Sequence, residues 1–99
     1  MGFPDSIAAY PDVQELFDKA LDSSKGLKLT FASENEAILN MGRFNAYRVR
    51  LRRENERTYP ADHPHHKSTP YDCLMIKRRG NQVIVEKLQV GRYNIEDLL

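Results

Sequence analysis

The 99-residue chain has little cysteine and little glycine, and each shortage excludes a class of site. Cys73 is its single cysteine, which excludes an internal disulfide and a zinc site built from several thiolates. The five glycines stand too far apart for a phosphate-binding loop, a dinucleotide fingerprint or a nucleophile elbow. The sequence therefore carries no recognisable catalytic signature, predicts no cofactor and leaves an enzymatic activity unsupported.

Long hydrophobic runs are also missing. No uninterrupted apolar stretch approaches the roughly 18 residues that a transmembrane helix needs. Pro4 and Asp5 stand where a signal peptide would require its apolar segment. With 40% hydrophobic and 29% charged residues, the composition is that of an ordinary globular chain. We expect a cytoplasmic protein with one domain and no membrane partner.

The first half of the chain predicts two helices and a strand. Pro11 suits a first helical turn, and apolar residues recur at helical spacing over the next ten positions. Residues 27–31 alternate between apolar and polar side chains, which is typical of a strand. Ser33 and Glu36 fit a capping box, so a second helix should run from there to about Asn55.

The second half predicts a β-hairpin. Tyr71–Arg78 and Gln82–Leu88 are rich in β-branched and apolar residues, and Gly80–Asn81 is a good two-residue turn between them. In that register Ile76 faces Val85. The order helix-strand-helix-hairpin predicts a small two-layer α+β domain.

The predicted domain covers residues 11–91, preceded by an N-terminal arm at 1–10 and followed by a C-terminal tail or short helix at 92–99. An alternative is a winged-helix-like fold, in which the long helix breaks at Gly42, because glycine in a helix interior costs about 1 kcal/mol. Arg43–Arg57 would then be the recognition helix, and the hairpin turn would be the tip of the wing.

Charge is distributed unevenly along the chain. Residues 1–42 hold three basic and seven acidic side chains, whereas residues 43–99 hold twelve basic and seven acidic ones. Steps of 100° per residue gather several arginines on the far side of the second helix, and more cations stand near the hairpin turn. The candidate nucleic-acid-binding residues are Arg43, Tyr47, Arg50, Arg53, Arg57, Lys77, Arg78 and Arg79.

These residue types suit a phosphate backbone. Arginine offers paired donors to phosphate oxygens, and an aromatic ring such as Tyr47 could stack on an exposed base. The first hypothesis is therefore a small nucleic-acid-binding protein that contacts the phosphates of DNA or RNA. The alternative reading is an ordinary solvated helix face, because arginine is a good helix former and exposed charges need no ligand.

Arg48 is a separate case, because it falls in the middle of the apolar stripe of the second helix. Burying an unpaired charge is costly, so the guanidinium should have a partner. Asp72 and Glu86 are the predicted partners.

The loop over residues 58–70 contains His63, His65 and His66, which are residue types that zinc, nickel or copper prefer. Pro64 makes it hard for these histidines to converge on one ion, and Cys73 could complete a site only if the loop folded back on the hairpin. A lone cysteine in a strand is usually a small hydrophobic residue. We therefore predict no metal site and no catalytic residue, and a metal-dependent enzyme is the weakest hypothesis.

Apolar residues exceed what two helices can cover. They include Met75, Ile84, Phe3, Ile7 and the segment 95–99. Surplus apolar surface on a small domain favours a protein partner or a homodimer. The second hypothesis is therefore a non-enzymatic protein-interaction or inhibitor module, such as a phage-type accessory protein, that docks on an acidic or apolar partner surface.

Overall fold

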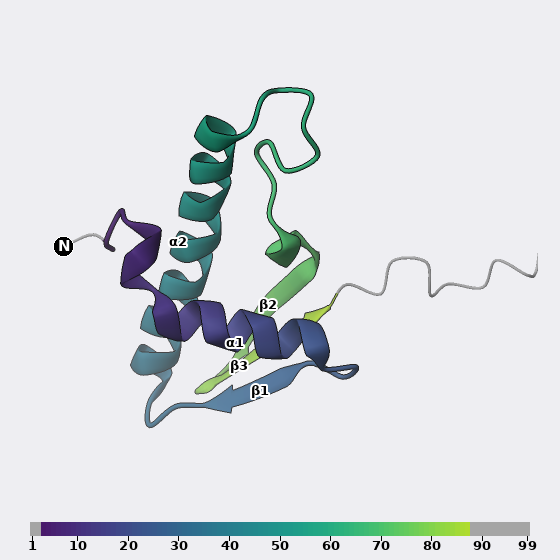
Figure 1. Cartoon of the computed structure of the whole chain (residues 1–99). Helices are drawn as coiled ribbons and strands as arrows, with labels where there is room; N and C mark the ends of the chain where they lie inside the picture. The colour runs from purple at the N-terminus through teal and green to yellow at the C-terminus, as the bar shows by residue number, and fades with distance from the viewer. Residues whose placement is uncertain (1–2, 88–99) are drawn as a thin grey trace, which may run out of the picture.

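The computed structural model describes residues 3–87 (Figure 1). Its elements are the 3-10 turn η1 (Ile7–Ala9), α1 (Pro11–Asp22), β1 (Leu27–Thr30), α2 (Glu34–Thr58), the 3-10 turn η2 (Pro70–Cys73), β2 (Leu74–Arg79) and β3 (Gln82–Lys87). This order confirms the predicted small α+β domain of helix, strand, helix and hairpin. The expected tail or short helix at 92–99 lies outside the described residues. Among the helices of residues 3–87, none is long and apolar enough to cross a membrane.

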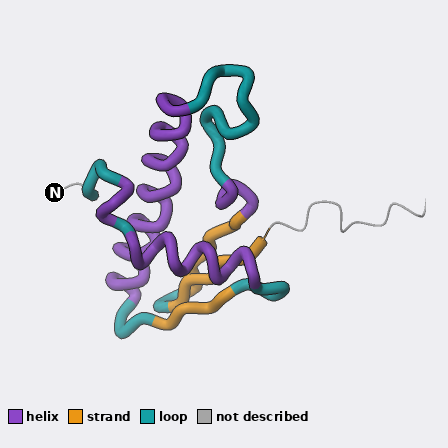
Figure 2. The backbone as a smooth tube through the Cα atoms, in the orientation of Figure 1, coloured by secondary structure: helices purple, strands orange, loops and turns teal. Residues whose placement is uncertain are grey.

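The three strands form an antiparallel sheet in the order β1-β3-β2 (Figure 2). Ile76 lies opposite Val85, as predicted, and Leu29 lies opposite Val83. The last strand of residues 3–87, β3, is therefore the central one, with β1 and β2 on either side of it. This register places every second residue of the three strands on the same face.

Both helices pack on the sheet face that carries the buried side chains Leu74, Val83 and Val85. Phe17 of α1 lies at the centre of this layer with no exposed surface, and its ring contacts those of Phe44, Tyr47 and Tyr71 at centroid distances of 5.3–6.0 Å. Tilted and edge-on contacts of this kind are the favoured arrangement of aromatic rings. The domain core is therefore an aromatic cluster between two helices and one sheet face.

Helix α2 runs unbroken through Gly42. A Cβ atom built at Gly42 would lie 2.9 Å from Cζ of Phe3, so the ring of Phe3 occupies the space that the missing side chain leaves. The winged-helix-like alternative needs a break at this position, and the continuous helix contradicts it. The glycine instead lets the Phe3 ring pack closely against the helix.

The predicted capping box at the start of α2 is present in a shifted form. The Ser33 hydroxyl accepts from the backbone N–H of Glu36, as expected, at 3.1 Å. The Glu36 carboxylate accepts from the N–H of Ala32 rather than from that of Ser33. Both side chains thus satisfy backbone donors at the helix N-terminus.

The N-terminal arm, residues 3–10 in the structure, lies against the side of α2 (Figure 1). The Tyr10 hydroxyl donates to the Pro4 carbonyl at 2.6 Å, which closes the arm into a compact turn around η1. Phe3 and Ile7 pack against the core cluster. Apolar residues expected as surplus surface are therefore partly used to fix the arm in place.

Candidate functional site

Two of the four predicted helix arginines are held by acidic residues near the N-terminus. Arg43 donates to both carboxylate oxygens of Asp12, at 2.8 and 3.0 Å, and this hydrogen-bonded pair lowers the pKa of Asp12. Arg50 donates to the Phe3 carbonyl at 3.1 Å and approaches the Asp5 carboxylate at 3.4 Å. Their side chains are only 28% and 17% exposed. The four arginines therefore do not form a row of unpaired cations. Asp12 of α1 and Asp5 of the arm lie beside two of them.

Tyr47 lies inside the domain, with 3% of its surface exposed. Its ring contacts Tyr10, Phe17 and Tyr71, and burial raises the pKa of its hydroxyl. No face of this ring is free to stack on a base. Tyr47 is buried because Phe17 of α1 and Tyr71 of η2 pack against its ring.

The other two helix arginines remain exposed and line a surface hollow of about 530 Å³. We call it the arginine hollow; its lining residues are Asp5, Arg50, Arg53, Glu56 and Arg57. Arg57 pairs with Glu54 at 2.7 Å, whereas Arg53 makes no ion pair or hydrogen bond with its side chain within residues 3–87. The hollow thus keeps three guanidinium groups beside two carboxylates.

The predicted cations of the hairpin lie at the opposite end of α2. Arg78 approaches Glu34, the first residue of α2, at 3.7 Å, and Figure 1 shows the hairpin turn beside the start of that helix. Lys77 pairs with Glu86 at 2.7 Å, and Arg79 is exposed. At 1.5 Å per residue, most of the length of α2, about 30 Å, separates these residues from the arginine hollow. The structure therefore divides the predicted basic site into two clusters.

Arg48 is satisfied by backbone carbonyls instead of a carboxylate. Its guanidinium donates to the carbonyl oxygens of Tyr71, within η2, and of Leu74, at the start of β2. Asp72 pairs with Arg52 at 2.8 Å, so neither of the two predicted acids hydrogen-bonds to Arg48. Burial lowers the pKa of Arg48, and the neighbouring Arg52 adds to the effect. This arginine therefore fastens α2 to the sheet.

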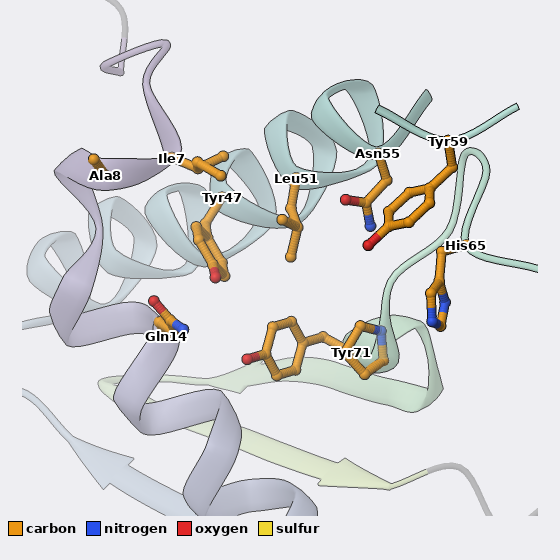
Figure 3. A pocket seen from close by; sticks show the side chains of 10 residues that line it. Ile7, Ala8, Gln14, Tyr47, Leu51, Asn55, Tyr59, His65 and Tyr71 are labelled. Atoms are coloured by element: carbon orange, nitrogen blue, oxygen red, sulfur yellow. The ribbon is translucent and has the colours of Figure 1, made fainter. Parts of the chain in front are cut away.

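A larger cavity, of about 690 Å³, opens on the other side of α2 (Figure 3). We call it the aromatic cavity, and its lining comes from the arm, α1, α2, the loop after α2 and η2. The lining residues are Ile7, Ala8, Gln14, Tyr47, Leu51, Asn55, Tyr59, His65, Pro70 and Tyr71. None of them is an acid, a lysine or an arginine.

Burial favours the neutral form of two phenol groups that line the aromatic cavity, those of Tyr47 and Tyr71. Tyr71 donates to the Asp18 carboxylate at 2.6 Å. Burial, together with this hydrogen bond, raises the pKa of Tyr71 well above its usual value. Two amide side chains, Gln14 and Asn55, supply the other polar groups of the lining. The cavity therefore suits an uncharged group with an apolar or aromatic body.

The loop histidines do not form a metal centre. His63 stacks on Tyr59 with ring centroids 4.4 Å apart, and His65 meets the same tyrosine edge-on. Within the described part of the chain, no three His, Cys, Asp or Glu side chains are grouped closely enough to hold a metal. Cys73 is exposed at the end of η2 and is not the small buried hydrophobic residue that the sequence suggested, because the strand begins only at Leu74.

The aromatic cavity was not predicted from the sequence. Tyr47, Leu51 and Asn55 follow one another at intervals of four, which does place them in one row on a helix. The facing wall comes from Ile7 and Tyr71, which are far away in the chain. Only the packed structure brings these walls together.

Comparison with known proteins adds no relative, since no family model, no curated protein and no solved structure matches this chain.

Proposed function

We propose that this domain is a non-enzymatic protein-interaction module whose aromatic cavity receives an apolar or aromatic side chain of a protein partner. The observation that carries the proposal is the size and chemistry of the cavity. Its volume of about 690 Å³ lies within the roughly 300–1,000 Å³ of ordinary ligand sites, and its walls are mostly apolar and aromatic.

The chemistry of the lining selects an uncharged occupant. Tyr59 offers a partly exposed ring, and Tyr47 and Tyr71 offer the small part of their surface that core packing leaves exposed. Aromatic pairs add about 0.5–1.5 kcal/mol to the gain from apolar burial. A charged group would lose its hydration with no opposite charge among the lining residues to compensate.

A peptide fits better than an isolated hydrocarbon. Gln14 carries an amide with donors and an acceptor, and Asn55, whose Nδ2 already donates to the Ser68 carbonyl at 2.6 Å, adds its amide oxygen as an acceptor. These groups match the N–H and C=O groups of a peptide backbone. An apolar partner surface is also favoured over an acidic one, because Asp12 and Asp5 already engage Arg43 and Arg50.

A pair of neighbouring alanines provides the test. Ala8 lines the cavity, whereas Ala9 belongs to the same exposed turn and does not. NMR titration with N-acetyl-tryptophanamide should shift the resonances of Leu51 and Tyr71, and Ala8→Trp should abolish these shifts. Ala9→Trp should leave them unchanged. Equal behaviour of the two variants, or no shift in the unmodified protein, would contradict the proposal.

Nucleic-acid binding is the second candidate function, and the exposure of Arg53, Arg57 and Arg79 favours it. With two or three phosphates contacted on duplex DNA, log K should fall with log salt at a slope of about −2 to −3. Titration with single- and double-stranded DNA and RNA at two salt concentrations is the test. Absence of binding at low salt, or binding that Arg53→Ala does not weaken, would remove this candidate.

A further inference from the structure

We propose that the arginine hollow is a binding site for a single phosphate group, and that Asp5 takes the place of this group in the free protein. The site does not depend on the aromatic cavity. It rests on the second candidate function only where the phosphate belongs to a nucleic acid.

The three arginines of the hollow stand in one row. Arg50, Arg53 and Arg57 lie at positions i, i+3 and i+7 of α2, which places them within an arc of about 60° at 100° per residue. At 1.5 Å per residue they span about 10 Å along the axis. Long, planar guanidinium groups in such a row can reach one tetrahedral anion from several sides.

The acids next to this row are already engaged. Glu54 pairs with Arg57 at 2.7 Å, and Glu56 approaches Lys67 at 3.7 Å. Two cations thus offset these two carboxylates, while Arg53 has no acidic partner within residues 3–87. The hollow therefore retains positive charge for an anion.

Asp5 is a weakly held partner of Arg50. Its side chain is 96% exposed, and a single contact of 3.4 Å joins it to the guanidinium. Exposed pairs of this kind contribute little, because water screens them and ordering the side chains costs entropy. Nε of Arg50 is buried without a hydrogen-bond partner. Nη1 donates to the Ala46 carbonyl, and Nη2 donates to Phe3 and Asp5. A phosphate that replaces Asp5 offers more acceptor oxygens than one carboxylate.

Anion binding requires the Asp5 side chain to move, but not the arm. Phe3 stays anchored on Gly42, and its carbonyl accepts from Arg50 independently of Asp5. This anchor keeps the Asp5 carboxylate next to the hollow at a high local concentration. Asp5 is therefore a built-in competitor of the phosphate group.

The test follows the arginine Nε–H signals by NMR during titration with sodium phosphate at constant ionic strength. Signals of Arg50, Arg53 and Arg57 should shift with phosphate and not with chloride. Asp5→Asn should strengthen phosphate binding roughly two- to fivefold, and Arg53→Gln should weaken it by a similar factor. Arg79→Gln, which removes an exposed arginine at the other end of α2, is the matched control and should have no effect.

A short oligothymidylate in a second titration distinguishes the sources of the phosphate. Shifts of the same three arginines identify a nucleic-acid backbone, whereas a response to inorganic phosphate alone identifies a free phosphate or a phosphomonoester. No response to either probe, equal shifts with chloride, or an affinity that Arg53→Gln leaves unchanged would overturn the site. An affinity unaffected by Asp5→Asn would overturn the role of Asp5. Resonances of Leu51 and Tyr71 report on the aromatic cavity separately.

Discussion

Two hollows border the same half of α2, and they differ in the charge of their lining residues and in how those residues are packed. The aromatic cavity takes Tyr47, Leu51 and Asn55 from the helix. The arginine hollow takes Arg50, Arg53 and Arg57, together with Glu56. At 100° per residue their centres lie roughly 130° apart around the helix axis. The arm contributes to both hollows. A single helical segment thus presents an uncharged site on one face and a cationic site on the other.

The difference between the hollows lies in what holds their side chains. Tyr47 and Tyr71 are fixed by ring packing in the core, where interiors are as dense as organic crystals. Arg57 is held only by a pair between exposed groups, and the side chain of Arg53 by no pair within residues 3–87. The cavity is therefore preorganised, whereas the arginine side chains are free to rearrange around an anion.

The largest expected effect comes from removing a ring on the cavity side. Tyr47→Ala should lower the free energy of unfolding by about 3 kcal/mol, because it opens a void in the aromatic core. Arg53→Ala, on the opposite face, should change it by less than about 0.5 kcal/mol. Chemical denaturation of the two variants measures both. Similar losses of unfolding free energy in Tyr47→Ala and Arg53→Ala would contradict the difference in packing between the two faces of α2.

Tyr71→Phe tests the buried hydroxyl at the edge of the cavity. Loss of the bond to Asp18 should cost about 1 kcal/mol at neutral pH. The pKa of Tyr71 is raised in the folded state, so its contribution is fully present below the ordinary value of 10 and is lost as the pH rises above it. Stability measured on the alkaline side should therefore fall less steeply in Tyr71→Phe than in the unmodified protein. Equal slopes of stability against pH in the two proteins would contradict a raised pKa of Tyr71 in the folded state.

Asp12→Asn tests the acid that holds Arg43, the first of the four helix arginines. Because Asp12 is largely exposed, the loss at neutral pH should stay below about 1 kcal/mol. Arg43 lowers the pKa of Asp12, so this contribution is present above the ordinary value of 3.8 and disappears as the pH falls below it. The stability difference between variant and unmodified protein should shrink in acid. Glu15→Gln, which removes an exposed i,i+4 pair with Lys19, is the control and should show a smaller effect.

The smallest expected effect is that of Gly42→Ala. Alanine improves helix propensity by about 1 kcal/mol, but its Cβ would displace the Phe3 ring, so the two effects should nearly cancel. In a Phe3→Ala background the same substitution should stabilise the protein by nearly the full amount. A double-mutant cycle measured by thermal unfolding tests this coupling. Equal effects in both backgrounds would mean that the arm does not dock on Gly42.

Local patterns were enough to predict the two helices, the three strands and the pairing within the hairpin, but not the pairing of β1 with β3. The two-residue turn Gly80–Asn81 between Tyr71–Arg78 and Gln82–Leu88 predicts the hairpin register, because the length of the turn fixes which residues lie opposite each other. Ser33 marks the start of α2 because its hydroxyl accepts a hydrogen bond from the backbone N–H of Glu36, three residues later. These interactions join neighbours in the chain, so the sequence contains both partners side by side.

The candidate site was predicted less well, since its partners are distant in the chain. A helical projection shows which arginines share a face, yet it cannot show that Asp12 lies 31 residues earlier and still binds Arg43. It also cannot show that the arm covers Gly42 or that η2 closes a cavity over Leu51.

By itself the sequence determined the kind of domain, the order of its elements and the row of cations on α2, because short-range spacing and hydrophobic periodicity encode these features. The tertiary structure alone decided which cations stay exposed, where Tyr47 lies and that an uncharged cavity exists. These outcomes depend on the free energies of burial and ion pairing between segments that are brought together only by the folded chain.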